Sequence, residues 1–337
     1  LIQGLFENKF ILIFSALFGF GAWQQMRRDI GRYYKRLFWL AGFGVLNLLF
    51  LFGGDILLPY ALIGLVLPLL NRLGDRALLG AAISLWVAAI IGNLIFGVQH
   101  DLSAAPDTTA AMAATADPYL SANFWQVAMT RLSEWRSFQI YSLYCNYPMV
   151  ASAMLGGLLA ARLVARDGFA ALTERLAGLA AVLWLPALAG NIAYGAFASL
   201  PSAAEPYRFA YATLIFRPLF AVPLSLCIAA LILTAAARVE GGRIAAWLAP
   251  AGRLSLTIYL GMSLVGSLIF FGYGFGLKGQ VSLPETFAIT AAITLGFILL
   301  AAWWERRLGA GPAERLLRFC MNLSLPRPAR SKNLGRL

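Results

Sequence analysis

The chain has 337 residues, of which 60% are hydrophobic and only 12% are charged, and its mean hydropathy is +0.74. A composition this apolar excludes an ordinary soluble domain and predicts an integral membrane protein, whose solvent is lipid. The net charge of +12 alone would also fit a nucleic-acid-binding protein, so the positions of the charges must decide what it means.

Nine apolar segments follow one another along the chain, and each predicts a membrane-spanning helix. Most approach or exceed the roughly 20 residues that a helix needs to cross the hydrocarbon, and their Leu, Ala, Phe and Gly content suits helices better than barrel strands. The segments cover residues 8–25, 37–52, 56–70, 77–98, 138–161, 172–197, 211–237, 249–272 and 284–304. The sequence therefore predicts an all-α, polytopic transmembrane helix bundle over residues 1–304, followed by a basic cytoplasmic tail over 305–337.

Basic residues gather in alternate loops between these segments, as the positive-inside rule requires. One face collects 21 of the 27 Lys and Arg residues and carries a charge of +14, whereas the other face carries −2. We expect the basic face in the cytoplasm, which places the N-terminus outside and the C-terminus inside. Topology and anionic lipid at the cytoplasmic face then account for the positive balance, and nucleic acid is not a predicted partner.

The stretch LFLFGGDILLPYALIG, residues 49–64, places Asp55 between two apolar runs. These runs, 37–52 and 56–70, are a little short for full spans, so we expect a tight outer hairpin or a dipping pair of helices. Gly53 and Gly54 suit the end of the first helix, and Asp55 suits the N-cap of the second. An ionisable residue in a membrane segment is also a candidate functional group because its burial is costly, so both interpretations of Asp55 stay open.

The one long insertion, an outer loop over residues 99–137, has a first half that is rich in Ala, Thr, Asp and Pro and indicates a flexible loop. Its second half predicts a helix lying on the membrane surface, or a lid over an outward-facing cavity. The apolar positions at helical spacing are Phe124, Val127, Ala128, Leu132 and Trp135. The only histidine, His100, stands beside Asp101 at the start of the insertion and is a candidate general base, although neighbouring residues on a helix do not face each other.

Arg217 lies in the stretch TLIFRPLFAVPLSL, which at first sight is buried. If Pro218 occupies the first helical position, the span runs from residue 219 to 237 and Arg217 lies at its outer mouth. Arg217 then either extends to the interface or holds an anion or carboxylate in an outer cavity.

Some residues predict packing rather than chemistry. The three cysteines lack the spacing of a zinc site or a disulfide framework, so no metal site is predicted. Small residues four apart let helices approach closely, and the pairs are Ser15 with Gly19, Gly156 with Ala160, and Gly157 with Ala161.

Several stretches resemble, in order, the YeiB-like family of bacterial membrane proteins, also called domain of unknown function 418. They are KFILIFSALFGFGAWQQ, RYYKRLFWLAGFGVLN, GGDILLPYALIGLVLPL, GRLSLTIYLGMSLVGSLIFFGYGFGL and LGAGPAERLLR. The most specific features are GDIL together with Tyr60 and Gly64, and GRLSLTIY together with the later GP-E-R. The family usually begins with another helix that carries an Asp-x-x-Arg-Gly signature, which this chain lacks. An N-terminus outside the membrane also fits a missing first span, and LIQGLFENKF does not read as a cleavable signal peptide.

The resemblance implies a protein of the bacterial inner (plasma) membrane, distantly similar to transmembrane acyltransferases that take acyl groups from cytoplasmic acyl-CoA and deliver them to outer acceptors. It makes acyl-CoA the expected donor. The candidate catalytic residues are Asp55 and His100, and the candidate substrate-binding residues are Asn47, Tyr60, Arg217, Arg253 and Tyr259. Asn47 stands where the family commonly has a histidine, and asparagine cannot serve as a general base.

Arg253, together with the basic cluster at residues 27–36, would either hold the phosphates of coenzyme A or anchor the chain on anionic lipid. Three functions stay open at this point. The chain is a membrane-embedded acyltransferase, a transporter of a small molecule or lipid whose route Asp55 and Arg217 line, or a non-catalytic membrane subunit of a larger complex. The absent first helix and Asn47 favour the third.

Overall fold

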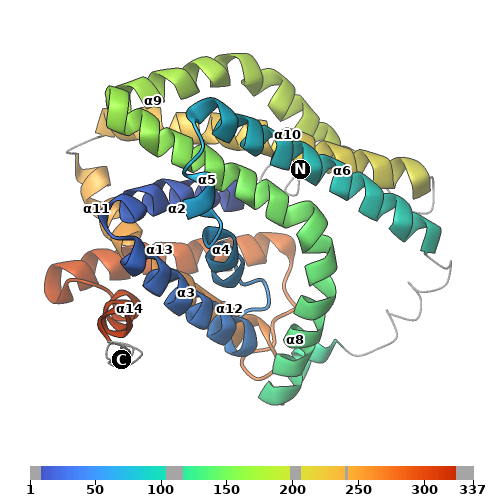
Figure 1. The fold of residues 1–337 in the computed structure, drawn as a ribbon. Coiled ribbons are helices and arrows are strands. Elements are labelled where there is room, and N and C mark those ends of the chain that lie inside the picture. The colour runs from blue at the N-terminus through green and yellow to red at the C-terminus, as the bar shows by residue number, and fades with distance from the viewer. Residues whose placement is uncertain (1–8, 104–116, 198–205, 240–241, 324–337) are drawn as a thin grey trace, which may run out of the picture.

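The computed structural model describes residues 9–103, 117–197, 206–239 and 242–323, which form a bundle of helices (Figure 1). These residues contain no strand, which confirms the all-α prediction for this part of the chain. In chain order the elements are α2 (Lys9–Arg28), α3 (Ile30–Phe50), α4 (Leu57–Gly64), α5 (Leu67–Leu70), α6 (Asp75–Ser103), η1 (Pro118–Leu120), α8 (Phe124–Tyr141), η2 (Ser142–Asn146), α9 (Tyr147–Phe197), α10 (Pro206–Val239), α11 (Arg243–Arg253), α12 (Ser255–Phe270), α13 (Leu283–Leu308) and α14 (Pro312–Asn322).

Helices overlap every one of the nine predicted apolar segments. The segment 56–70 is divided between α4 and α5, and 249–272 is divided between α11 and α12, which meet at an angle of 79°. Among the described residues, four helical stretches are long and apolar enough to cross a membrane, or five when the bent pair counts as one span. The fold is therefore that of a helical protein with several apolar helices of membrane-spanning length.

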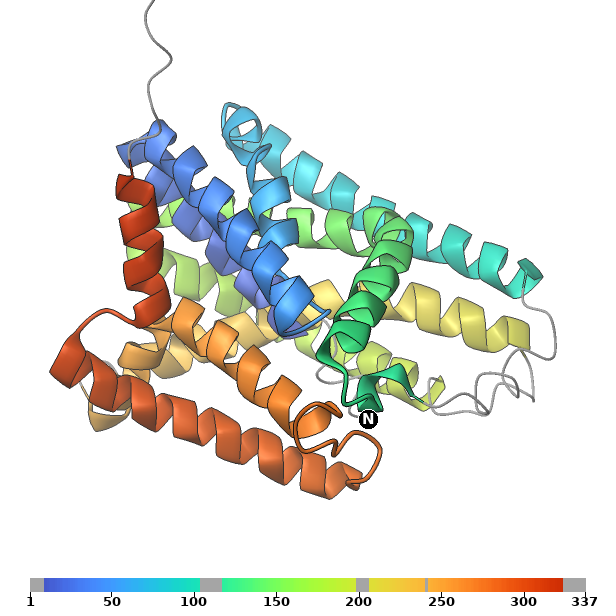
Figure 2. The same ribbon diagram turned by 90° about the horizontal axis from the view of Figure 1, so that it is seen from below.

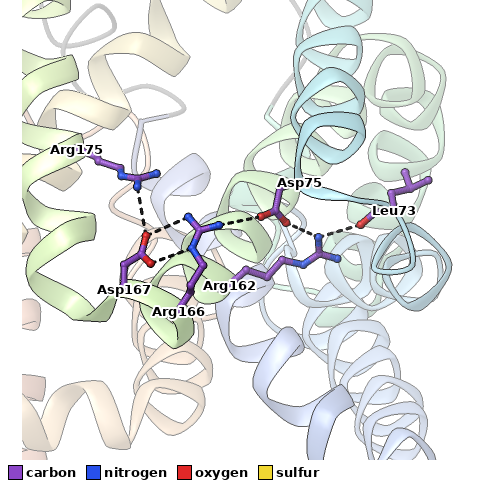
Figure 3. A network of polar contacts seen from close by, with 6 residues as sticks. All are labelled: Leu73, Asp75, Arg162, Arg166, Asp167 and Arg175. Carbon is purple, nitrogen blue, oxygen red and sulfur yellow. Dashed lines mark hydrogen bonds and ion pairs between the residues drawn. The ribbon is translucent and has the colours of Figure 1, made fainter.

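Gly168 divides α9 into two helices, 147–167 and 169–197, which correspond to the fifth and sixth predicted segments. Its φ of 86° and ψ of 172° are accessible to glycine and strained for other residues. Ion pairs surround this bend and connect it to the start of α6 (Figure 3), and the network consists of Leu73, Asp75, Arg162, Arg166, Asp167 and Arg175. Loops that the charge pattern assigned to the basic face thus lie side by side.

Close backbone contact joins α2 to α9 at Gly19 and Gly157, two of the small residues for which close helix packing was predicted, whereas a Cβ atom on Gly156 would have no neighbour within 4 Å. A Cβ atom on Gly19 would lie 2.0 Å from the carbonyl oxygen of Met154, and one on Gly157 would lie 1.8 Å from that of Ala16. Neither position can hold a larger side chain without separating the helices. The glycines therefore set the distance between α2 and α9.

The pair α12 and α13 lies on the opposite side of the bundle from α6 (Figure 2). Helix α14 packs against α3 and connects the pair to it. The Glu314 carboxylate of α14 accepts hydrogen bonds from the backbone nitrogens of Leu256 (2.8 Å) and Thr257 (3.1 Å), which are free donors in the first turn of α12. The beginning of the predicted tail is thus a helix that caps another helix, while residues 324–337 lie outside the described ranges.

The interpretation of Pro218 as the first residue of a helix is wrong, because α10 runs from Pro206 to Val239 and Pro218 lies inside it. Side chains of neighbouring helices donate hydrogen bonds to backbone oxygens of α10 near its prolines. Trp86 Nε1 donates to the Pro218 oxygen at 2.8 Å, and Asn191 Nδ2 donates to the Phe220 oxygen at 2.9 Å. Arg217 is consequently a residue within a long helix rather than at the start of one.

Candidate functional site

Asp55 lies in the turn between α3 and α4 and is buried, with 6% of its surface exposed. Its Oδ2 atom accepts the backbone N–H of Leu58 in the first turn of α4 at 2.8 Å. The carboxylate thus caps α4 as the sequence predicts, although Asp55 precedes the cap position, Ile56, by one residue. Helix α3 ends at Phe50, before Gly53 and Gly54, and neither glycine has a positive φ.

The second oxygen of Asp55 joins two of the other predicted site residues. Asn47 Nδ2 of α3 donates to Oδ1 at 2.9 Å, and the Tyr259 hydroxyl of α12 donates to it at 3.1 Å. The Tyr259 oxygen in turn accepts the Ile56 backbone N–H at 3.1 Å and Asn47 Nδ2 at 3.2 Å. The group Asn47, Asp55 and Tyr259, called the Asp55 group below, therefore ties α3, α4 and α12 together.

Gly44 makes this close arrangement feasible. A Cβ atom at this position would lie 2.5 Å from the Leu58 nitrogen and 2.7 Å from Asp55 Oδ2. The start of α4 can approach α3 only because Gly44 has no side chain. Gly44 lies one helical turn before Asn47, so the two residues share one face of α3, and their spacing is a sequence signal for this close approach.

The other predicted site residues lie elsewhere. Tyr60 of α4 is buried; its hydroxyl donates to the Ile11 carbonyl at 2.8 Å and lies 2.7 Å from Ser15 Oγ, so it fixes α4 to α2. Arg217 donates to the Tyr141 hydroxyl at 2.6 Å, and this hydroxyl reaches Asn93 Oδ1 at 3.3 Å, which links α10, α8 and α6. None of the hydrogen bonds of Asp55 involves Arg217.

The last two candidate residues from the sequence, His100 and Arg253, lie at the ends of α6 and α11. His100 lies near the end of α6, where side chains are outside the described part of the structure. Arg253, at the end of α11, forms a bidentate ion pair with Glu305 of α13, with Nη2 2.7 Å from Oε2. Arg253 thus connects α11 to α13 through a carboxylate of the same chain.

A pocket of about 410 Å³ opens beside the turn that holds Asp55, and we call it the α8 pocket. It lies between this turn, η1, α8 and the loop after α12. Its lining is largely aromatic and consists of Phe52, Gly53, Gly54, Tyr119, Arg131, Glu134, Trp135, Phe138 and Phe271. The helix predicted over residues 124–135 is therefore present as part of α8, and it forms one wall of a cavity.

Arg131 of α8 is the most deeply buried charged residue of this pocket, with 0% of its surface exposed. Its two terminal nitrogens donate to neutral oxygens, Nη1 to the Leu49 carbonyl at 2.9 Å and Nη2 to the Tyr273 hydroxyl at 3.0 Å. Its Nε has no hydrogen-bond partner. The guanidinium carbon lies 5.3 to 5.8 Å from the centres of three rings, those of Phe124, Phe271 and Tyr273.

Within the described residues, no carboxylate forms an ion pair with Arg131. A buried cation whose partners are all neutral is unusual, because burial of a charge is costly unless an opposite charge compensates it. By the charge pattern alone, Arg131 is one of the six basic residues outside the basic face. The missed signal was its spacing, since it follows Phe124 by seven residues and therefore lies on the predicted apolar face of the helix.

Polar residues at the mouth of the α8 pocket hold η1 to α8 and to the loop before α13. The Tyr119 hydroxyl donates to Glu134, and Lys278 Nζ lies 2.8 Å from Asp117 Oδ2 and 4.1 Å from the centre of the Tyr119 ring. The hydrogen bond from Lys278 lowers the pKa of the Asp117 carboxyl group. Burial, followed by the Glu134 carboxylate, raises the pKa of Tyr119, which keeps this hydroxyl protonated as a donor.

The sequence profile of a family described as "Protein of unknown function (DUF418)" matches residues 163–324. YxaH from Bacillus subtilis (strain 168), described as an uncharacterized protein, is 26% identical over 345 aligned residues, which cover 96% of this chain and 82% of that protein. YeiB from Escherichia coli (strain K12), also described as uncharacterized, is 26% identical over 345 residues, which cover 97% and 84%. Just under half of the chain is thus similar to the DUF418 family, and nearly the whole chain is similar to YxaH and YeiB. The YeiB-like resemblance is thereby confirmed.

No solved structure matches the chain. The segment matched by the family profile contains Tyr259 and the helices α10 to α14, whereas Asp55, α8 and most of the α8 pocket precede it. The two full-length relatives cover nearly the whole chain, pocket included.

Proposed function

We propose that this chain is a DUF418 protein that crosses the bacterial inner membrane nine times, with its basic loops in the cytoplasm. Its proposed activity is the transfer of an acyl group to an acceptor that is bound in the α8 pocket. The observation that carries the proposal is the pocket itself. It combines a buried guanidinium, a carboxylate at its mouth and aromatic walls in one cavity of about 410 Å³. Pockets of this size with a few converging polar groups are typical of small-molecule sites.

The proposed chemistry uses Glu134 as the general base. An acceptor hydroxyl or amine at the mouth gives its proton to the Glu134 carboxylate while its oxygen or nitrogen attacks the carbonyl carbon of an acyl-CoA thioester. Because the charge pattern predicts this pocket on the outer face, the proposed reaction requires the thioester of the cytoplasmic donor to reach the pocket through the helix bundle. The new carbon–oxygen or carbon–nitrogen bond forms, the carbon–sulfur bond breaks, and the leaving thiolate takes the proton back from Glu134. Arg131 holds the acceptor from below, and the Tyr119 hydroxyl orients the Glu134 carboxylate.

The Asp55 group has a positioning role in this proposal. It fixes the turn that contributes Gly53 and Gly54 to the pocket, and its carboxylate is occupied by three donors of the protein. A transport route lined by both Asp55 and Arg217 is not favoured, because the two side chains belong to separate hydrogen-bonded groups. A purely structural subunit would not need a cavity with a buried cation.

The test is transfer of a labelled acyl group from acyl-CoA by the purified protein in vesicles made from bacterial membrane lipids. Glu134→Gln is expected to slow transfer by about 10²-fold or more, the usual contribution of a general base. The matched control is Arg136→Gln, an exposed residue on the same helix that does not line the pocket. No label transfer to any lipid or envelope acceptor would contradict the proposed activity, and equal rates in Glu134→Gln and wild type would contradict the assignment of the site.

A further inference from the structure

We infer that the α8 pocket selects a zwitterionic amphiphile, whose anionic group lies over Arg131 and whose cationic, hydrogen-donating group lies at Glu134. The inference rests on the proposed function only in taking this pocket as the substrate site. It adds the chemical class of the molecule that the pocket binds, and binding can be measured without an acyl donor.

The floor of the pocket favours an anionic group. Arg131 is fully buried, lines the cavity and directs its terminal nitrogens to a backbone carbonyl and a tyrosine hydroxyl, so its charge is not neutralised by any described carboxylate. Its Nε is a buried donor without an acceptor. A phosphate or carboxylate group at the floor would supply both the missing charge and the missing acceptor.

The mouth of the pocket disfavours a ligand that is only anionic. Glu134 is exposed, lies one helical turn after Arg131, and accepts one hydrogen bond, from the Tyr119 hydroxyl. A headgroup that carries only negative charge would be repelled by this carboxylate. A headgroup that also carries an ammonium group would bind to the Glu134 carboxylate. Glu134 therefore disfavours lipids whose headgroup is only anionic.

The walls of the pocket favour an apolar body attached to this headgroup. Phe52, Trp135, Phe138 and Phe271 line the cavity, and Phe52 and Phe138 are about half exposed at its edge. Aromatic side chains with one exposed face at the membrane boundary suit the region where a headgroup joins its hydrocarbon chains. A free polar headgroup would leave these walls uncovered, so the amphiphile as a whole is the expected ligand.

The experiment measures lipid binding to the intact chain by native mass spectrometry and by competition in nanodiscs, without acyl-CoA. The probes are phosphatidylethanolamine, which is zwitterionic, phosphatidylglycerol, which is anionic, and free phosphoethanolamine. Wild type is expected to bind phosphatidylethanolamine about tenfold more tightly than phosphatidylglycerol, a factor typical of one charge-assisted contact. Free phosphoethanolamine is expected to bind more weakly than the lipid.

Two variants test the two ends of the site, with Arg136→Gln as the matched control. Glu134→Gln, at an exposed position, is expected to fold normally and to bring the two lipids to within about twofold of each other. Arg131→Lys keeps the charge but loses the Nε donor, and it is expected to weaken both lipids about tenfold.

The inference is overturned if wild type does not distinguish the two lipids, if Glu134→Gln keeps the full preference, or if free phosphoethanolamine binds as tightly as the lipid. The inference is also overturned if the Arg131→Lys variant binds both lipids with the same affinity as the control variant Arg136→Gln. Lipid preference without acyl transfer would refute the proposed function and leave this inference standing. Acyl transfer without lipid preference would do the reverse.

Discussion

Replacement of Asp55 by alanine should destabilise the protein through the three hydrogen bonds that its carboxylate accepts. The Leu58 N–H loses its cap at the start of α4, and caps of this kind are worth about 0.5 to 2 kcal/mol. The partly buried Tyr259 hydroxyl loses its acceptor, at a further cost of about 1 to 3 kcal/mol. Asn47 Nδ2 keeps the Tyr259 oxygen as a partner, so it adds little. The expected loss is about 3 kcal/mol of unfolding free energy.

The assay is reversible unfolding in mixed micelles as the fraction of denaturing detergent rises, followed by circular dichroism and tryptophan fluorescence. Asp55→Asn serves as the matched variant, because its oxygen can still accept the Leu58 N–H, and we expect it to lose only about 1 kcal/mol. An Asp55→Ala protein within about 0.5 kcal/mol of wild type would refute the reasoning that the carboxylate joins α3, α4 and α12. If Asp55→Asn folds normally, has a much lower kcat for acyl transfer and keeps wild-type lipid binding, the catalytic role predicted from the sequence is supported instead.

Three more predictions concern the supports of the site. Gly44→Ala should lower the unfolding free energy by about 1 to 3 kcal/mol in the same micelle assay, because its Cβ would lie 2.5 Å from a backbone nitrogen of α4; an unchanged midpoint would contradict the close approach. Glu314→Ala should leave the first turn of α12 uncapped and speed hydrogen exchange of the Thr257 amide, whereas wild-type exchange there would argue against the cap. Lys278→Met should raise the pKa of Asp117 toward its ordinary value, which an NMR titration of the carboxyl group would measure. The Asp117 carboxylate would then protonate at a higher pH, so the stability that it contributes is lost earlier as the pH falls. An unchanged pKa of Asp117 would rule out the ion pair.

Local patterns made much of the fold predictable. Long apolar runs and turn residues predicted the positions of the helices, because helix formation and turns depend mainly on residues that are close in the sequence. The bend at Gly168 falls between two predicted segments. The small-residue spacing predicted close helix contacts at Gly19 and Gly157, but not which helices meet there. The position of Asp55 between two predicted helices made its role as a helix cap predictable. Asn47, eight residues earlier, donates a hydrogen bond to the same carboxylate.

Contacts between distant segments were not predictable from local patterns. The hydrogen bond from Trp86 to the Pro218 oxygen of α10 joins residues 132 positions apart, and the pairing of Arg253 with Glu305 joins residues 52 positions apart. Arg131 is the most instructive case. Its spacing is that of a residue on the apolar face of a helix, but the fold alone brings Leu49 and Tyr273 to its guanidinium group. Only the fold shows that no carboxylate of the described residues forms an ion pair with Arg131.

The Asp55 group and the α8 pocket share one short connection, the turn of residues 51–54. Arg131 holds the chain just before this turn at the Leu49 carbonyl, and Asp55 holds it just after, through Asn47 and Tyr259. Gly53 and Gly54 therefore enter the pocket wall from a segment that is fixed at both ends, so a change at Asp55 displaces the wall of the site without touching the substrate. A positioning defect of this kind raises KM and relaxes lipid preference in Asp55→Asn, whereas loss of a catalytic carboxylate lowers kcat and leaves lipid binding unchanged.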